Sequence, residues 1–294
     1  MVLPRVKHSW LRALGREDLP SSITLPDGEY RHLRTYKHDF FAATGLYEGP
    51  GGKVILKVGR TAGLLGLPMA WLGRLHAAHE SRLYRELDGL EGIPRWLGRY
   101  GPTGFVHAFV EGHPLQRDER PDDRFFDRLE ALLAELHRRG IAYVDLEKRE
   151  NILVGDDGRP CLIDFQISWR WEGHNGRPRR GLQRLIPLAL GRLLLAKLQS
   201  GDRYHLLKHR RRHRPDTLTA EQLAASYRRG WFIELHRRLS WPFTALRRGL
   251  LKRLTGRSRS AKQDGPEFVH PGGAAPRAGN ARAEDGGVRH LSPS

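Results

Sequence analysis

Two short apolar runs in the middle of the chain predict a β-hairpin. Residues 152–163 read as a strand, a Gly-Asp-Asp-Gly turn and a second strand. Asp145 and Asn151 precede the first run, and Asp164 follows the second. Because the two open ends of a hairpin lie at the same edge, these three oxygen-bearing side chains are predicted to lie together.

Other segments show the period of a strand or of a helix. Residues 53–58 alternate and are rich in β-branched side chains, which predicts a strand. Residues 75–90 and 125–139 carry leucines at helical spacing and predict amphipathic helices, and Gly140 is placed to end the second one. Residues 104–115 pass from a strand into a turn. The pattern therefore predicts a mixture of strands and helices.

The segment 182–198 is strongly apolar but contains Arg184, Arg192 and Lys197. It fits either a buried core helix, which we favour, or an interfacial helix that lies on a membrane. Nothing in the chain reaches 18 charge-free apolar residues, so no transmembrane helix is predicted. From about Gly256 the apolar periodicity stops, and we expect residues 256–294 to be a disordered tail.

Composition narrows the class of protein. The chain has 294 residues, of which 39% are hydrophobic, enough for one two-lobed domain or two small ones. Its single cysteine, Cys161, excludes a disulfide within the chain and agrees with a reducing compartment. The first residues lack the apolar run of a signal peptide. We therefore expect a cytoplasmic protein, with peripheral contact at the inner face of the membrane as an open alternative.

The net charge of +18 is concentrated in the second half of the chain. Arginine and lysine cluster at residues 177–180, 208–214, 247–248 and 252–253. Such a field attracts polyanions, whether nucleic acid, anionic lipid or phosphorylated glycolipid, although an arginine-rich solvated surface has the same composition. Zinc-finger spacing, an aromatic RNA-binding run and a Gly-X-X-Gly clamp are all missing from the sequence, so no specific nucleic-acid motif accompanies the charge.

The grouping of Asp145, Asn151 and Asp164 suits phosphoryl transfer from Mg-ATP. One carboxylate can orient the acceptor hydroxyl, while an Asn and a second Asp hold Mg²⁺ against the phosphates. Residues 140–168 resemble the catalytic loop and the metal-binding loop of the protein-kinase-like superfamily. The segment is most similar to bacterial lipopolysaccharide-core (Kdo/heptose) kinases and to RIO-like atypical serine/threonine kinases. The segment departs from the standard motif in three ways: Tyr143-Val144 replaces His-Arg, Gln166 replaces Gly, and one extra residue lies between Asp145 and Asn151.

The resemblance implies an α+β, two-lobed protein-kinase-like fold. It has a small N-lobe with an antiparallel sheet and one helix, and a mainly helical C-lobe. The expected division is an N-terminal extension at 1–29, the N-lobe at 30–110, the C-lobe with its basic helical region at 111–255, and the tail at 256–294.

The resemblance also assigns the reacting groups. Asp145 is expected to be the catalytic base, with Glu147 as a weaker rival, and Asn151 and Asp164 to be the Mg²⁺ ligands. Lys148 is expected to neutralise the transferring phosphoryl group, with Arg149 as a close rival.

In the N-lobe, Lys57 ends a Val-Ile-Leu-Lys run and is expected to grip the ATP phosphates. Glu80 is expected to brace that lysine, because it lies beside an apolar helical stripe, whereas Glu86 is expected to pair with Arg82. The roof of the nucleotide site lacks the usual glycines, and Lys37 with His38 is expected to supply charge there.

The connection between the lobes is expected to bind the nucleoside. The resemblance implies that main-chain groups near Phe109 and Val110 bind adenine and that Glu111 binds the ribose hydroxyls. ATP and Mg²⁺ are the expected cofactors.

Three functions remain open. The first is a kinase for a sugar hydroxyl of a polyanionic, lipopolysaccharide-core-like glycolipid, favoured because no Ser/Thr/Tyr-rich activation segment follows Asp164. The second is an atypical serine/threonine kinase with a protein acceptor. The third is a pseudokinase or basic binding module.

Overall fold

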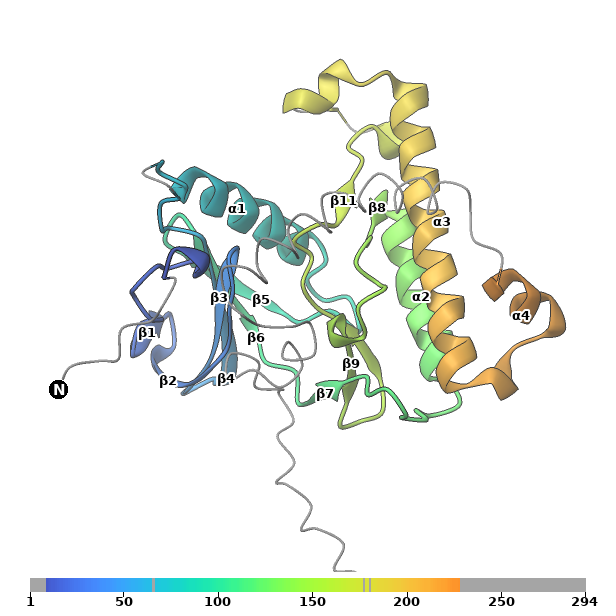
Figure 1. Ribbon diagram of the computed structural model, residues 1–294, viewed down its shortest axis with the longest axis horizontal. Helices are drawn as coiled ribbons and strands as arrows, with labels where there is room; N and C mark the ends of the chain where they lie inside the picture. Colours follow the sequence, from blue (N-terminus) through green and yellow to red (C-terminus); the bar gives the residue numbers. More distant parts are fainter. Residues whose placement is uncertain (1–8, 65–66, 177, 180, 228–294) are drawn as a thin grey trace, which may run out of the picture.

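A six-stranded antiparallel sheet forms the first half of the computed structural model, which describes residues 9–64, 67–176, 178–179 and 181–227. Its strands lie in the order β1-β2-β3-β4-β6-β5, and Figure 1 shows them on the left in blue to teal. The bounds are β1 Ser22–Leu25, β2 Gly28–His38, β3 Ala42–Gly49, β4 Gly52–Gly59, β5 Trp96–Tyr100 and β6 Gly104–Ala108. The strand predicted at 53–58 is the body of β4, which pairs with β3 and β6 at the centre of the sheet.

One helix, α1 (Ala70–Glu86), packs against β4 and β6. It begins at Ala70 rather than at residue 75 and ends at Glu86 rather than at residue 90, so the predicted boundaries were wrong at both ends. Gly73 brings the start of this helix against the end of β4, because a Cβ at this position would collide with the carbonyl oxygen of Arg60. The close approach fixes the height at which α1 presents its polar side chains to the sheet.

The segment ahead of residue 30, expected as an extension, packs on the same sheet. Leu14, Leu19 and Ile23 are buried in one apolar cluster with strand residues. Arg60, fully buried, donates hydrogen bonds from its guanidinium to the carbonyl oxygens of Trp10 (2.9 Å), Phe40 (2.9 Å) and Gly63 (3.0 Å). Arg60 therefore ties the N-terminal segment to the end of β4.

The second half of the molecule is mainly helical. Figure 1 shows α2 and α3 side by side at the right, with the small strands between them and the large sheet. The helices are α2 Phe125–Arg138, α3 Leu188–His213 and α4 Ala220–Tyr227; the small strands are β7 Gly112–Pro114, β8 Ile141–Ala142, β9 Ile152–Gly155, β10 Pro160–Leu162 and β11 Trp169–Arg170. The predicted hairpin is confirmed as β9 paired with β10. This α+β architecture, a sheet lobe followed by a helical lobe, is the one predicted from the sequence.

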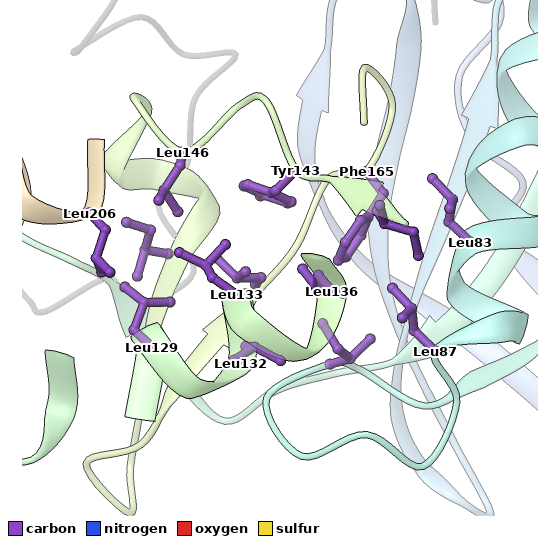
Figure 2. Packing of buried hydrophobic residues seen from close by; sticks show 14 of the residues in the cluster. Leu83, Leu87, Leu129, Leu132, Leu133, Leu136, Tyr143, Leu146, Phe165 and Leu206 are labelled. Carbon is purple, nitrogen blue, oxygen red and sulfur yellow. The ribbon is translucent and has the colours of Figure 1, made fainter. Parts of the chain in front are cut away.

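A shared apolar core joins the two lobes (Figure 2). Leu83 of α1 and Leu87, the residue after this helix, lie near Phe165, which follows Asp164. Leu136 of α2 lies near Tyr143, which follows β8. Because both loops of the predicted site are rooted in this core, their backbone positions are fixed relative to α1.

The apolar segment 182–198 is only partly a core helix. It forms a short 3-10 turn, Gly181–Leu185, and the first half of α3. Leu195 is buried, but Leu182, Leu185 and Leu193 are exposed, so the prediction of a core helix was wrong for this end. None of the helices in the described residues is long and apolar enough to cross a membrane. The basic residues at 247–253 and the predicted tail at 256–294 lie outside the described residues.

Candidate active site

Lys57 lies between two carboxylates where the lobes meet. Its Nζ is 2.8 Å from Glu80 on α1 and 2.7 Å from Oδ1 of Asp164, which follows β10. Burial alone would lower the pKa of Lys57, but the charges of Asp164 and Glu80 raise it. The ammonium group is therefore held protonated and fixed in direction between the two lobes.

Glu80, rather than Glu86, is the helix glutamate at this point. Its carboxylate also accepts a hydrogen bond from the N–H of Phe165 (3.1 Å), so it links α1 directly to the loop after β10. Burial, reinforced by the negative charge of Asp164, raises the pKa of Glu80 to about 7. Glu86 pairs with Arg170 at 2.7 Å, so its predicted pairing with Arg82 was wrong; Arg82 instead pairs with Glu172.

Asp164 has the left-handed backbone conformation, with φ 61°, which is uncommon for a residue other than glycine. Burial alone would raise the pKa of its carboxyl, but Lys57 and Lys37 hold that pKa well below its usual value. Asp164 is thus a charged carboxylate in a half-buried position, which suits a metal ligand.

Asp145 is the centre of a second polar group on the catalytic loop. Its Oδ2 accepts hydrogen bonds from Nζ of Lys148 (2.7 Å) and from Nδ2 of Asn151 (2.9 Å). Burial raises the pKa of Asp145, and Lys148 opposes that shift. A buried carboxylate with a raised pKa that is oriented by two donors is a better proton acceptor than a solvated aspartate.

Glu147, the predicted rival of Asp145, has a different partner. It is largely exposed and pairs with Lys208 of α3 at 3.1 Å. Lys148, by contrast, is an exposed cation that contacts Asp145 directly. The arrangement brings Asp145, Lys148 and Asn151 together on one loop.

Asp202 on α3 holds the backbone of the loop that carries Asp145, a role that sequence analysis missed. Its carboxylate accepts hydrogen bonds from the N–H groups of Tyr143 and Val144, each at 2.8 Å, and lies 3.0 Å from Nε2 of His137. Val144, a β-branched residue, has φ 69°, a strained conformation that the carboxylate holds in place. The sequence carries no local signal for this contact, because Asp202 lies in a polar helical run far from the loop.

On the nucleotide side, Lys37 and His38 have different surroundings. Lys37 pairs with Asp39 at 2.9 Å, and its charge contributes to lowering the pKa of Asp164. The His38 ring contacts the guanidinium of Arg12 (2.7 Å) and the N–H of Leu14 (3.2 Å), and burial lowers its pKa to about 4. His38 is therefore neutral and faces the N-terminal segment, so the expectation that it supplies charge was wrong.

The three residues between the lobes lie at the opposite end of β4 from Lys57. The N–H of Phe109 donates to the carbonyl oxygen of Lys53 (3.1 Å), and the carboxylate of Glu111 pairs with Nζ of Lys53 (2.9 Å). Val110 and Glu111 line an open pocket of about 410 Å³. The structure thus places these residues together but does not bring them to the cluster around Lys57.

The donor set fits a magnesium ion held jointly with a phosphate. The described residues contain no group of three or more His, Cys, Asp and Glu side chains placed to hold a metal. The amide of Asn151 has its NH₂ turned to Asp145, and Asp164 is a charged carboxylate. One amide oxygen and one carboxylate suit Mg²⁺, which keeps water and substrate oxygens as its other ligands.

Comparison with known proteins yields relatives that cover only part of the chain. No family model matches. The chain is 36% identical over 111 residues to protein kinase PINOID of Oryza sativa, which is 33% of this chain and 22% of that protein. It is 38% and 40% identical over 73 residues to the serine/threonine-protein kinases WAG2 and WAG1 of Arabidopsis thaliana, 24% of this chain and 15% of each of them.

The chain therefore spans about a fifth or less of the length of the curated relatives that it matches. Among solved structures it is similar to the Rio2 kinase from Chaetomium thermophilum, with a TM-score of 0.45 and 16% identity, over 72% of this chain and 63% of that one. Part of the chain is thus similar in sequence to protein kinases.

Proposed function

We propose that the protein is an ATP-dependent phosphotransferase that transfers the γ-phosphoryl group to a hydroxyl. The observation that carries the proposal is the position of Lys57, held at 2.8 Å and 2.7 Å between Glu80 of the sheet lobe and Asp164 of the helical lobe. A fixed ammonium beside a charged carboxylate can bind a phosphate and its metal at the same time. The similarity of part of the chain to serine/threonine kinases supports the same reaction.

Each group in the site has a part in that reaction. Lys57 grips the phosphates, and Asn151 with Asp164 would hold Mg²⁺, which supplies charge neutralisation on the phosphate oxygens. Asp145 orients the acceptor hydroxyl and receives its proton as the new oxygen–phosphorus bond forms. The bond between the γ-phosphorus and the bridging oxygen breaks, and ADP leaves. Lys148 stabilises the developing negative charge from the other side of Asp145.

The proposed acceptor is a sugar hydroxyl of a polyanionic glycolipid. The segment after Asp164 supports this choice, because residues 173–201 contain six Arg and Lys residues without any Asp or Glu. A protein hydroxyl is the second candidate, favoured by the serine/threonine kinases among the relatives.

The test combines purified full-length protein, Mg²⁺ and γ-labelled ATP with a cell extract separated into glycolipid and protein fractions. Label in the glycolipid fraction supports the first acceptor, and label in the protein fraction supports the second. Asp145→Asn and Asp164→Asn are expected to reduce labelling by at least about a hundredfold, whereas Asp118→Asn, an exposed aspartate in the loop before α2, leaves it unchanged.

Nucleotide binding provides the independent readout. Asp145→Asn should retain ATP affinity, measured by fluorescence titration, since this residue acts on the acceptor. If ATP binds but no fraction is labelled by the unmodified protein, the chain is a pseudokinase and the proposal is wrong.

A further inference from the structure

The N-terminal end of α3 and the turn before it carry an exposed leucine surface. Leu182, Leu185, Leu188, Leu190 and Leu193, here called the leucine platform, are between 46% and 81% exposed. In Figure 1 this yellow segment rises above the end of α2, away from the large sheet. Single exposed leucines are ordinary on protein surfaces, but five within 12 consecutive residues are a local concentration of exposed apolar side chains, which is typical of an interaction site.

The buried face of α3 lies opposite Leu190 and Leu193 and keeps these two leucines of the platform outward. Gly191, Leu195 and Gln199 are buried at a spacing of four residues. Gln199 donates hydrogen bonds to the carbonyl oxygens of His137 (3.1 Å) and Ile141 (3.4 Å). A Cβ at Gly191 would collide with the ring of Trp171, so the helix cannot rotate to bury its leucines without losing this contact. The exposure of the platform is therefore built into the packing.

The charged residues along this stretch of sequence have one sign. Residues 173–201 contain no Asp or Glu, and their Arg and Lys residues are Arg177, Arg179, Arg180, Arg184, Arg192 and Lys197. Leu190, Leu193 and Lys197 follow the i, i+3, i+7 spacing of one helix face, so apolar and cationic side chains share that face. This pairing of leucines with cations is the composition of helices that lie on anionic lipid.

Other occupants match the platform less well. A nucleic acid would use the cations but leave the leucines in water, since its backbone is recognised by charge. Residues 228–255 of the same chain contain eight Arg and Lys residues and one Glu, so their sequence brings the same sign of charge. A second copy of the chain would meet the same repulsion.

We infer that the leucine platform docks the protein on the surface of an anionic lipid bilayer, with the leucines entering the interface and the cations facing the headgroups. The docking does not require phosphoryl transfer, so it can be tested without ATP and fails or succeeds separately from the proposed function.

The first experiment is flotation of the full chain with vesicles of phosphatidylcholine, with and without phosphatidylglycerol. The protein should float with the anionic vesicles and remain in solution with the neutral ones. The double variant Leu185→Ser, Leu193→Ser should lose at least roughly tenfold in partitioning, because each removes an inserted apolar side chain. The matched control, Leu33→Ser with Leu75→Ser, removes two leucines of the sheet lobe that are 48% and 58% exposed and should float as the unmodified protein does.

A second measurement places the contact directly. Cys161 is the only cysteine and is buried, so a thiol introduced as Leu185→Cys can be labelled selectively with an environment-sensitive fluorophore. Anionic vesicles should shift its emission to the blue, and the same label at Leu33→Cys should not respond. Unchanged flotation of the Leu185→Ser, Leu193→Ser variant, or equal binding to neutral vesicles, would overturn the inference. Loss of flotation in the Arg184→Gln, Arg192→Gln variant but not in the leucine variant would show that charge alone attracts the protein to the anionic vesicles. This result would also overturn the inference.

Discussion

At the scale of single residues, the candidate site depends on how Asp145 is charged. Burial raises the pKa of its carboxyl, and the hydrogen bond and charge of Lys148 lower it. Asp145 must be ionised to accept a proton from the acceptor hydroxyl, so activity falls as the pH falls through the pKa of this group. Because Lys148 lowers the pKa of Asp145, a substitution of Lys148 can change how activity depends on pH.

We predict that Lys148→Ala moves the acid limb of the pH profile of kcat/KM to higher pH. Without the ammonium group the pKa of Asp145 rises, so the variant loses proportionally more activity at about pH 6 than at about pH 8. Lys208→Ala is the control, because Lys208 pairs with Glu147 and not with Asp145. A profile that keeps its acid limb, or moves it to lower pH, would show that Asp145 is not the group that titrates.

Sequence reasoning succeeded for the residues that local topology brings together. A hairpin with a short turn places its two flanking loops at one edge, and an apolar helical stripe selects the face on which Glu80 lies. Sequence reasoning failed for His38, because a strand pattern does not show which other segment covers a side chain. In the structure the N-terminal segment covers His38, through the N–H of Leu14. Asp202 was missed for the same reason, since its partners on the loop are 58 and 59 residues away.

At the scale of elements, α3 is the support for the catalytic loop. Its buried stripe packs on Trp171, and Asp202 on the same helix holds the amides of Tyr143 and Val144. The strained φ of Val144 persists only while these hydrogen bonds to Asp202 are formed, because the left-handed conformation costs about 1–2 kcal/mol. The position of Asp145, the next residue, therefore depends on a helix that need not touch the nucleotide.

We expect Asp202→Asn to lower activity at least about tenfold and to lower the free energy of unfolding by about 2–4 kcal/mol. The amide NH₂ of Asn cannot accept a hydrogen bond, so one donor of the loop loses its partner in a buried position. Steady-state kinetics and urea unfolding measure the two effects. Asp118→Asn, an exposed carboxylate in the loop before α2, is the control and should change neither by more than a small amount; equal losses in both variants would contradict the assignment.

The boundaries of the elements were predicted less well than their existence. The spacing of leucines identified α1 and the helix after residue 182, but apolar composition does not say which side of a helix meets a neighbour. For α3 that choice is made by Gly191, whose missing side chain admits Trp171 from a different part of the chain.

At the scale of the whole molecule, buried histidines couple stability to pH. Burial lowers the pKa values of His107 and His209 to about 4 each, below the usual value of about 6.5. As the pH falls from about 6.5 towards 4, the unfolded chain takes up protons that the folded chain does not bind, so stability is lost on acidification. His209 contacts the carbonyl oxygen of Leu146 at 2.8 Å and sits beneath the catalytic loop.

We predict that the midpoint of thermal unfolding falls between about pH 7 and about pH 5, and that His209→Gln makes the fall shallower. The Gln amide can donate to Leu146 but takes up no proton in this range. His174→Gln is the matched control, because the His174 side chain is only partly buried and its ring likewise contacts a carbonyl oxygen, that of Arg138. An equally steep fall in the His209→Gln protein would show that this group does not carry the pH dependence.

Because Arg60 binds carbonyl groups of the N-terminal segment, this segment limits where the protein can be truncated or fused to a tag. A fragment that starts at residue 30 would keep every candidate site side chain, yet it would remove Leu14, Leu19 and Ile23 from the core. It would also remove two carbonyl partners, those of Trp10 and Arg12, from the buried guanidinium of Arg60. The damage would fall on the end of β4, the strand that carries Lys57. We therefore expect that a protease site or an affinity tag inserted between residues 9 and 29 would weaken nucleotide binding. The effect would be indirect, because none of the candidate nucleotide-binding residues lies in this segment.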